Sequence, residues 1–212
     1  MDDEDADSSN TLLAFLEGKH KNFRNYLRIS GFSEIARCYF IMNAFDGAVT
    51  TLGILVGSYI AGVISPRIIL STGIGAGIAM AVSGFFGAFL AEEAERTRRI
   101  KNLERALNVD LDDTIIEKAA RFASVTAALV DAFSPLIASV VALIPLILSM
   151  LNIVDVWMGF LMSIGTILVM LLFLGIFLGS VSGERHVYYA VATTSAGVIT
   201  GILGIMLQWV LS

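Results

Sequence analysis

The sequence VWMGFLMSIGTILVMLLFLGIFLGSVS, residues 156–182, has 27 residues and not one charged side chain. A helix needs about 20 predominantly apolar residues to cross the roughly 30 Å of hydrocarbon in a bilayer. Four further stretches of comparable length and apolarity lie at about 38–64, 68–91, 123–151 and 187–211. The sequence therefore predicts an all-α polytopic membrane protein with five transmembrane helices.

The composition supports a membrane protein and argues against several other classes. Of the 212 residues, 56% are hydrophobic and 16% are charged, whereas about a quarter of the residues in a soluble domain are charged. The single cysteine, Cys38, excludes an intramolecular disulfide and a multi-cysteine metal site. The sequence contains no phosphate-binding loop, no nucleophile-and-base pattern and no basic groove with interleaved aromatic residues. We therefore expect neither an enzyme nor a nucleic-acid partner.

Polar segments divide the chain. Residues 1–10 are acidic and polar, which predicts a disordered tail. Residues 11–37 mix apolar and basic side chains, which predicts an amphipathic helix on the membrane surface. Residues 92–121 are predicted to form a short cytoplasmic insert, in which a charged extension of the second span is followed by a turn and a new helix. The first two spans then lie within 38–91, and the last three lie within 122–212.

The distribution of lysine and arginine predicts the orientation. Five of these residues lie in 11–37, seven lie in 92–121, and Arg185 separates the fourth and fifth spans. The opposite side of the membrane has only Arg67. Because basic residues accumulate on the cytoplasmic side, the N-terminus is expected in the cytoplasm and, after five crossings, the C-terminus outside.

The first apolar segment contains a charge, in NAFDGAVTTLG, residues 43–53. A charged side chain near the bilayer centre costs about 2.5–3.5 kcal/mol even on insertion scales, so Asp46 is expected to have a function. Helical spacing places Met42, Asp46 and Thr50 on one face. This face is the predicted polar lining of a transport path.

The second apolar segment contains a stripe of mostly small residues, at Gly73, Gly77, Met80, Gly84 and Gly87. We predict that this stripe faces the first segment, where Gly53 and Gly57 continue the face of Asp46, because small residues let helices approach closely. At 1.5 Å per residue, Asp46 and Met80 lie about 12 and 16 Å from the inner ends of their helices. A hard carboxylate beside a soft thioether suits a transition metal. The alternative is that Met80 is a packing residue.

Other carboxylates are candidate metal-binding groups. Glu92 and Glu95 lie on one helix face at the predicted cytoplasmic mouth, and Glu104 and Glu117 add acids to the same insert. Cation capture is one prediction for them. The alternative, which their arginine and lysine neighbours favour, is a solvated, salt-bridged helix. Asp131, about eight residues into the third apolar segment, is a candidate second intramembrane carboxylate or else lies nearer the interface.

Several of these sequences together resemble the vacuolar iron transporter family, from about residue 25 to the end of the chain. The most specific similarity is DGAVTT at 46–51. Weaker similarities are GIGAGIAMAVSG at 73–84, the acidic insert after the second segment, LIPLIL at 143–148 and the basic and aromatic start of the fifth segment.

The resemblance implies a homodimer that exports Fe²⁺, and in some members Mn²⁺, from the cytosol in exchange for protons. It also implies that Asp46 and Met80 line the transport path. Two features depart from the family: Gly84 stands where the family typically carries a glutamate, and the insert is only about 30 residues long. The short form resembles prokaryotic members, which implies the cell membrane.

The expected function is therefore export of a divalent transition metal, Fe²⁺ or Mn²⁺, by proton antiport. Asp46 is expected to bind the ion and to exchange a proton, with Met80 as a soft contact and with no permanently bound cofactor. The expected partners are the metal ion, the proton, the lipid bilayer and a second copy of the chain. One alternative is a passive metal channel. The other is a structural or interaction membrane protein in which Asp46 pairs with a neighbour such as Thr194.

Overall fold

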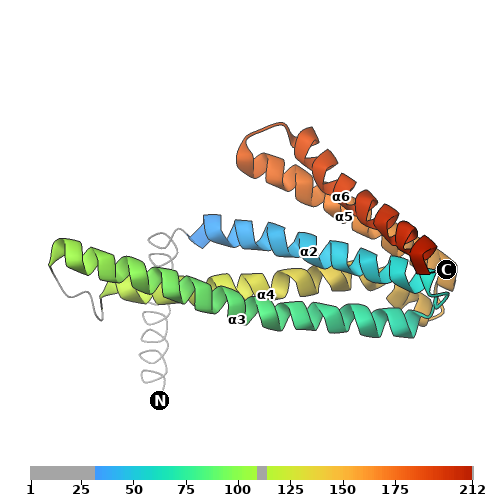
Figure 1. Cartoon of the computed structure of the whole chain (residues 1–212), viewed down its shortest axis with the longest axis horizontal. Coiled ribbons are helices and arrows are strands. Elements are labelled where there is room, and N and C mark those ends of the chain that lie inside the picture. The colour runs from blue at the N-terminus through green and yellow to red at the C-terminus, as the bar shows by residue number, and fades with distance from the viewer. Residues whose placement is uncertain (1–31, 109–113, 212) are drawn as a thin grey trace, which may run out of the picture. The chain divides into compact units, whose positions relative to one another are not determined.

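The computed structural model describes residues 32–108 and 114–211. They form five α-helices (Figure 1), with bounds α2 (Phe32–Ile60), α3 (Pro66–Leu107), α4 (Ile115–Met150), α5 (Val156–Ser182) and α6 (His186–Leu211). Each of the five is long and apolar enough to cross a membrane. This confirms the all-α prediction for the described residues. The predicted acidic tail, and the predicted surface helix up to residue 31, lie outside them.

Two helices continue well beyond the length that a membrane requires. α3 has 42 residues and is therefore about 63 Å long, roughly twice the hydrocarbon thickness of a bilayer. α4 has 36 residues. Asn108 follows α3 with a φ of 52°, a left-handed conformation in which asparagine is several-fold enriched.

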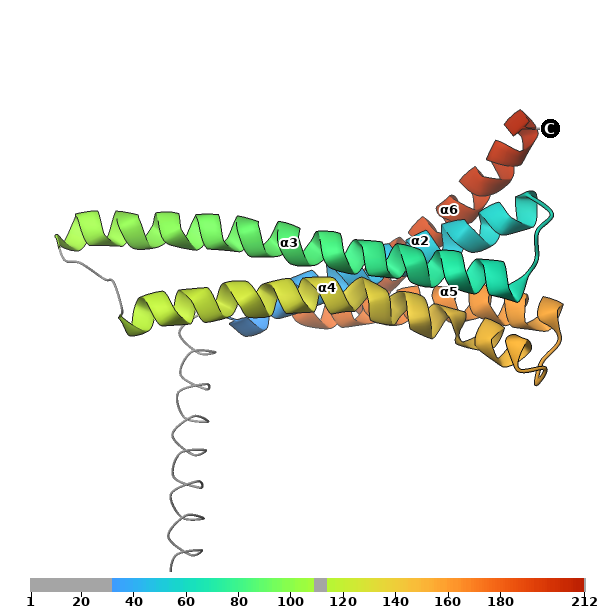
Figure 2. The same cartoon turned by 90° about the horizontal axis from the view of Figure 1, so that it is seen from below.

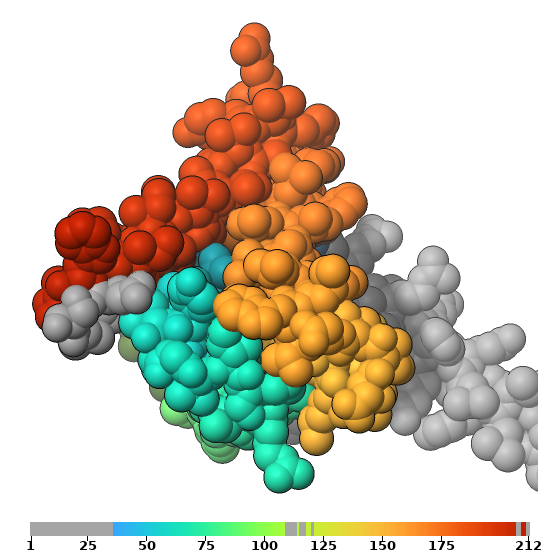
Figure 3. All heavy atoms as spheres, turned by 90° about the vertical axis from the view of Figure 1, so that its right-hand side faces the viewer, coloured from blue at the N-terminus to red at the C-terminus, as the bar shows by residue number. Residues whose placement is uncertain are grey.

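The chain divides into two compact units. The larger unit contains Cys38–Phe86 and the chain from Leu129 onward, and the smaller unit contains Gly87–Ala128 with Phe32–Arg37. Within the larger unit, α3 and α4 run side by side (Figure 2). The α2–α3 and α4–α5 connections lie next to each other at one end of this unit (Figure 3).

Aliphatic side chains from four helices form the core of the larger unit. The large side chains among them with no exposed surface are Leu55, Ile69, Leu143, Leu146, Ile167 and Leu171. Lipid tails are as apolar as these side chains, so close packing and interhelical hydrogen bonds hold such helices together.

Glycines bring α3 against α4. A Cβ atom at Gly73 would lie 2.6 Å from Leu143 Cδ1, and one at Gly77 would lie 3.2 Å from Leu136 Cδ1. The prediction that this stripe faces Gly53 and Gly57 of α2 is therefore wrong. A Cβ atom added at either of those two glycines would meet nothing within 4 Å. Residue spacing identifies which side chains share a face, but it does not identify the helix that covers that face.

α5 and α6 form an antiparallel pair. α5 is capped at its C-terminus by Gly183, whose φ of 69° is the left-handed conformation that glycine adopts without steric cost. Next to the turn, a Cβ at Gly179 would lie 2.7 Å from His186 Cα. Further along the pair, Thr193 Oγ1 donates a hydrogen bond to the Leu171 carbonyl at 2.8 Å. Close backbone approach and an interhelical hydrogen bond therefore both connect this pair.

Candidate functional site

One open pocket in the larger unit contains two of the predicted path residues, Asp46 and Met80. It has a volume of about 370 Å³ and lies among α2, α3 and α4. Its lining consists of Asn43, Asp46, Ala79, Met80, Ser83, Gly84 and Pro135. The structure thus brings the carboxylate of the first apolar helix and the thioether of the second to the same cavity.

Asp46 presents a carboxylate that has no partner among the described residues. It is exposed, and no described side chain or backbone group forms a hydrogen bond or an ion pair with it. Thr194, the neighbour suggested for it by the structural alternative, has a buried hydroxyl with no hydrogen-bond partner in the described part of the chain. The specific pairing of Asp46 with Thr194 is therefore absent.

Met80 is half-buried and contributes the one sulfur atom of the pocket lining. Met42 and Thr50 lie on the exposed side of α2, one turn before and one turn after Asp46, and they do not line the pocket. Met42 is 53% exposed. Of the four predicted path residues, the pocket therefore contains Asp46 and Met80.

Asp131 is buried among α2, α3 and α4, with 7% of its surface exposed. Its Oδ1 accepts a hydrogen bond from Asn43 Nδ2. A Cβ atom at Gly84 would lie 2.5 Å from Asp131 Oδ2. The absence of a side chain at Gly84 therefore makes room for this carboxylate, which lies directly behind the pocket wall.

Asn43 is the pocket residue that sequence reasoning missed. Its Nδ2 also donates to the Tyr39 carbonyl at 2.8 Å. Its spacing could have identified it, because Asn43 precedes Asp46 by three residues and residues three apart share a helix face. Its partner Asp131 follows it by 88 residues, so spacing alone gave no indication of the contact.

α4 contains a proline beside this cluster. Pro135 lines the pocket and has no N–H to donate to the carbonyl of Asp131, one turn earlier. Ser139, one turn later, donates its hydroxyl to the Gly47 carbonyl at 3.4 Å. The polar groups of α2 and α4 therefore meet along one seam.

Two acidic residues of the smaller unit are paired with arginines. Glu92 accepts from Arg96 Nε at 3.0 Å, and Glu95 accepts from Arg99 Nε at the same distance. Glu104 is half-buried, and the side chain of Glu117 lies outside the described residues. No group of three or more histidine, cysteine or acidic residues within the described ranges can hold a metal ion. Cation capture by these glutamates remains a prediction.

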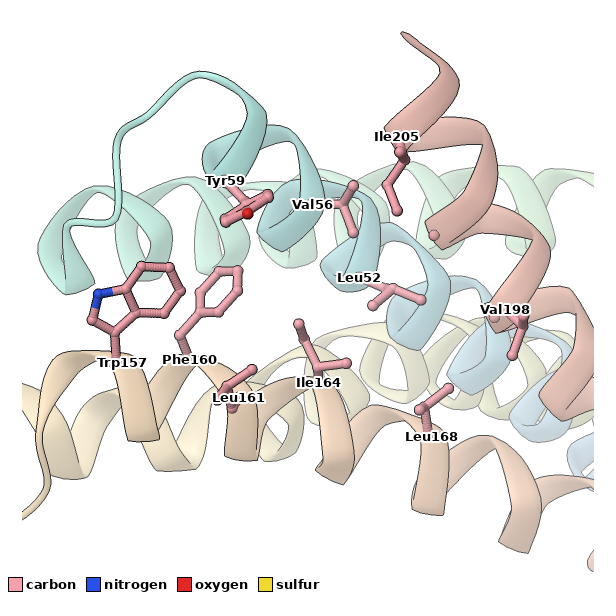
Figure 4. A pocket seen from close by; sticks show the side chains of 12 residues that line it. Leu52, Val56, Tyr59, Trp157, Phe160, Leu161, Ile164, Leu168, Val198 and Ile205 are labelled. Atoms are coloured by element: carbon pink, nitrogen blue, oxygen red, sulfur yellow. The ribbon is translucent and has the colours of Figure 1, made fainter. Parts of the chain in front are cut away.

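A second cavity of about 380 Å³ has a different character (Figure 4). Aliphatic and aromatic side chains of α2, α5 and α6 line it, and Tyr59, Trp157 and Phe160 gather at one end. The rings of Tyr59 and Trp157 meet edge to face with centroids 6.2 Å apart. Its lining includes no carboxylate, histidine or sulfur, so it lacks the side chains that usually bind metal ions.

Comparison with known proteins finds similarity along most of the chain. An uncharacterized protein of Methanocaldococcus jannaschii is 28% identical over 173 residues, which cover 80% of this chain and 87% of that protein. No protein-family model matches the chain, and no solved structure matches it. The functional argument therefore rests on the residues of the pocket.

Proposed function

We propose that the protein transports divalent transition metal ions, Fe²⁺ first and Mn²⁺ second, out of the cytoplasm in exchange for protons. The observation that carries this proposal is the carboxylate of Asp46, unpartnered among the described residues, in one pocket with the thioether of Met80. Ionisable residues in membrane-spanning helices are costly and usually mark an ion pathway. A carboxylate with a thioether favours a transition metal over Mg²⁺ or Ca²⁺.

Proton exchange follows from the same carboxylate. No described cation neutralises Asp46, so in an apolar surrounding either a proton or a bound metal ion must do so. A metal ion binds the deprotonated carboxylate, and binding therefore releases the proton. Alternation between these two states couples the flux of metal to the opposite flux of protons.

The exposed face of α2 supports a homodimer. Met42, Asp46 and Thr50 are exposed along it, and a Cβ at Gly53 or Gly57 would meet nothing within 4 Å. Facing lipid, a charged group on this surface would carry the desolvation cost of hydrocarbon. We propose that a second copy of the chain covers this face, where small residues allow close helix approach.

The distribution of lysine and arginine supports an orientation in the cell membrane with the N-terminus in the cytoplasm. Arg67, at the start of α3, lies near the α2–α3 connection, and Arg185 lies in the α5–α6 connection. Of the other eight lysine and arginine residues in the described ranges, five lie in the second half of α3. Under the positive-inside rule, this charged half lies in the cytoplasm.

Metal and proton fluxes measured together in proteoliposomes test the proposal. The wild-type protein should move Fe²⁺, kept reduced, or Mn²⁺ with an opposite change of internal pH. Asp46→Asn keeps the shape but cannot ionise, so it should abolish both fluxes. Asp155→Asn is a matched control outside the pocket, because asparagine and aspartate cap the N-terminus of α5 about equally well.

Each other outcome contradicts the proposal and points to a different function or site. Metal flux without proton movement in the wild-type protein would identify a passive channel. A wild-type protein that moves no metal would favour a structural role. Proton-coupled transport by Asp46→Asn at the wild-type rate would exclude Asp46 as the exchange site.

A further inference from the structure

The hydrogen bonds of Asn43 determine which way its amide points. Its Nδ2 donates both to the Tyr39 carbonyl, at 2.8 Å, and to Asp131 Oδ1. A backbone carbonyl and a carboxylate are acceptors, so the NH₂ group must face both of them. The two donor hydrogens of the amide are thereby used.

The carbonyl oxygen of Asn43 is then the amide atom left for a ligand. No described residue donates a hydrogen bond to Asn43 Oδ1. Asn43 lines the same pocket as Asp46 and Met80. We infer that Asn43 Oδ1 is a third ligand of the transported cation, held in that orientation by Asp131; this inference rests on the proposed function.

Gly84 is part of the same arrangement. Because a Cβ at Gly84 would lie 2.5 Å from Asp131 Oδ2 and 3.4 Å from the Asp131 carbonyl oxygen, any side chain there displaces the aspartate. A displaced Asp131 no longer accepts from Asn43 Nδ2, and the amide loses its fixed orientation. Gly84 and Asp131 are therefore positioning residues, in the way that outer groups orient the ligands of other metal sites.

The three donors together define a class of cation. Asp46 supplies a carboxylate oxygen, Asn43 a neutral carbonyl oxygen and Met80 a thioether sulfur. Oxygen donors suit Mn²⁺, whereas the sulfur favours transition metals over Mg²⁺ and Ca²⁺. The single sulfur among two oxygens does not suit Cu⁺, which prefers several soft ligands. The set therefore selects a divalent ion of intermediate softness, such as Fe²⁺ or Mn²⁺.

Binding of Mn²⁺ to the purified full-length protein in detergent, measured by titration calorimetry, tests this assignment. Gly84→Ala changes no ligand but displaces Asp131, and it should weaken Mn²⁺ binding roughly 10–100-fold. Gly75→Ala is its matched control on the same helix, because a Cβ there meets nothing within 4 Å. The control should bind Mn²⁺ like the wild-type protein.

Two double variants separate ligation from folding. Asn43→Leu with Asp131→Leu replaces the hydrogen-bonded pair by an apolar pair, which is often close to neutral for stability, but it removes the pocket oxygen. Asn43→Asp with Asp131→Asn reverses the hydrogen bond and keeps an oxygen at position 43. The reversed pair should bind Mn²⁺ at least as tightly as the wild-type protein, whereas the apolar pair should lose about tenfold or more.

The outcomes distinguish this inference from the function on which it rests. Equal Mn²⁺ affinity in the two double variants, or wild-type affinity in Gly84→Ala, would overturn the role of Asn43. If Asp46→Asn still abolished binding in that case, the proposed function would stand without Asn43. Failure of the wild-type protein to bind Mn²⁺ or Fe²⁺ would overturn both.

Discussion

Gly47 of α2 lies in direct contact with the backbone of Pro135 of α4: a Cβ atom at Gly47 would lie 2.8 Å from Pro135 Cα. Such a separation leaves no room for a side chain, and the nearby atoms belong to backbone that cannot rotate away. This contact sets how closely α2 approaches α4, and it lies one turn from both Asn43 and Thr51. The geometry of the pocket therefore depends on a glycine at position 47.

Gly47→Ala should destabilise the protein. Insertion of a methyl group into a packed interface typically costs about 1–3 kcal/mol, and here the group would meet backbone. Gly165→Ala, at an exposed position of α5 outside the proposed dimer contact, is the control. It has open space and gains helix propensity of roughly 1 kcal/mol. Thermal unfolding in detergent should show a lower midpoint for Gly47→Ala alone, and equal midpoints would contradict the contact.

Met80→Leu should alter the ion preference more than the maximal rate. The substitution approximately conserves volume and usually costs less than about 1.5 kcal/mol of stability, but it removes the sulfur. Affinity should fall more for soft Cd²⁺ than for Mn²⁺, and transport should fall by less than in Asp46→Asn. Met158→Leu, at an exposed position of α5, is the control. Competition between Cd²⁺ and Mn²⁺ in flux assays measures the difference, and an unchanged ratio would make Met80 a packing residue.

Glu92→Gln with Glu95→Gln tests cation capture at the start of the smaller unit. If these carboxylates gather ions, their loss should raise the half-saturating metal concentration and leave the maximal rate intact. Arg96→Gln with Arg99→Gln is the complementary change, because it removes the paired arginines and should lower the half-saturating concentration. The Glu95–Arg99 pair is exposed, and such pairs contribute only about 0–1 kcal/mol, whereas the Glu92–Arg96 pair is largely buried. Thermal unfolding of both variants therefore accompanies the flux assay. Identical concentration curves for all three proteins would leave a salt-bridged helix without a capture role.

The predicted orientation can be tested with single cysteines in a Cys38→Ser background. Arg67→Cys, near the α2–α3 connection, should react with an impermeant maleimide added outside intact cells. Arg185→Cys, in the α5–α6 connection, should react only after permeabilisation. The two positions are separated by three helices that are each long enough to cross a membrane. Labelling of both from the same side would disprove the five-span topology.

The exposed face of α2 should form the contact between two copies of the chain. In the same Cys38→Ser background, Gly53→Cys should give a disulfide-linked dimer under mild oxidation in membranes. Met158→Cys, also exposed but on α5, should remain monomeric. Gel mobility without reductant separates the two results. A dimer that forms through Met158→Cys instead would place the interface on α5.

The sequence by itself determined the helices. Length and apolarity are local properties, so an uncharged stretch such as residues 156–182 predicts its helix without any knowledge of its neighbours. The agreement extends to the bounds, since α5 spans Val156–Ser182. The fixed rise per residue likewise indicated that Asp46 and Met80 lie at similar depth, and both line one pocket.

Only the tertiary structure decided which helix faces which. The glycines of α3 pack on α4 through Leu143 and Leu136, and the stripe of α2 that was expected to receive them is exposed. The Asn43–Asp131 hydrogen bond joins residues 88 apart in the chain, and helical periodicity carries no information about such a contact. Helix formation depends on neighbours three or four residues away, whereas the assembly of this pocket depends on side-chain shapes that meet only after the helices have packed.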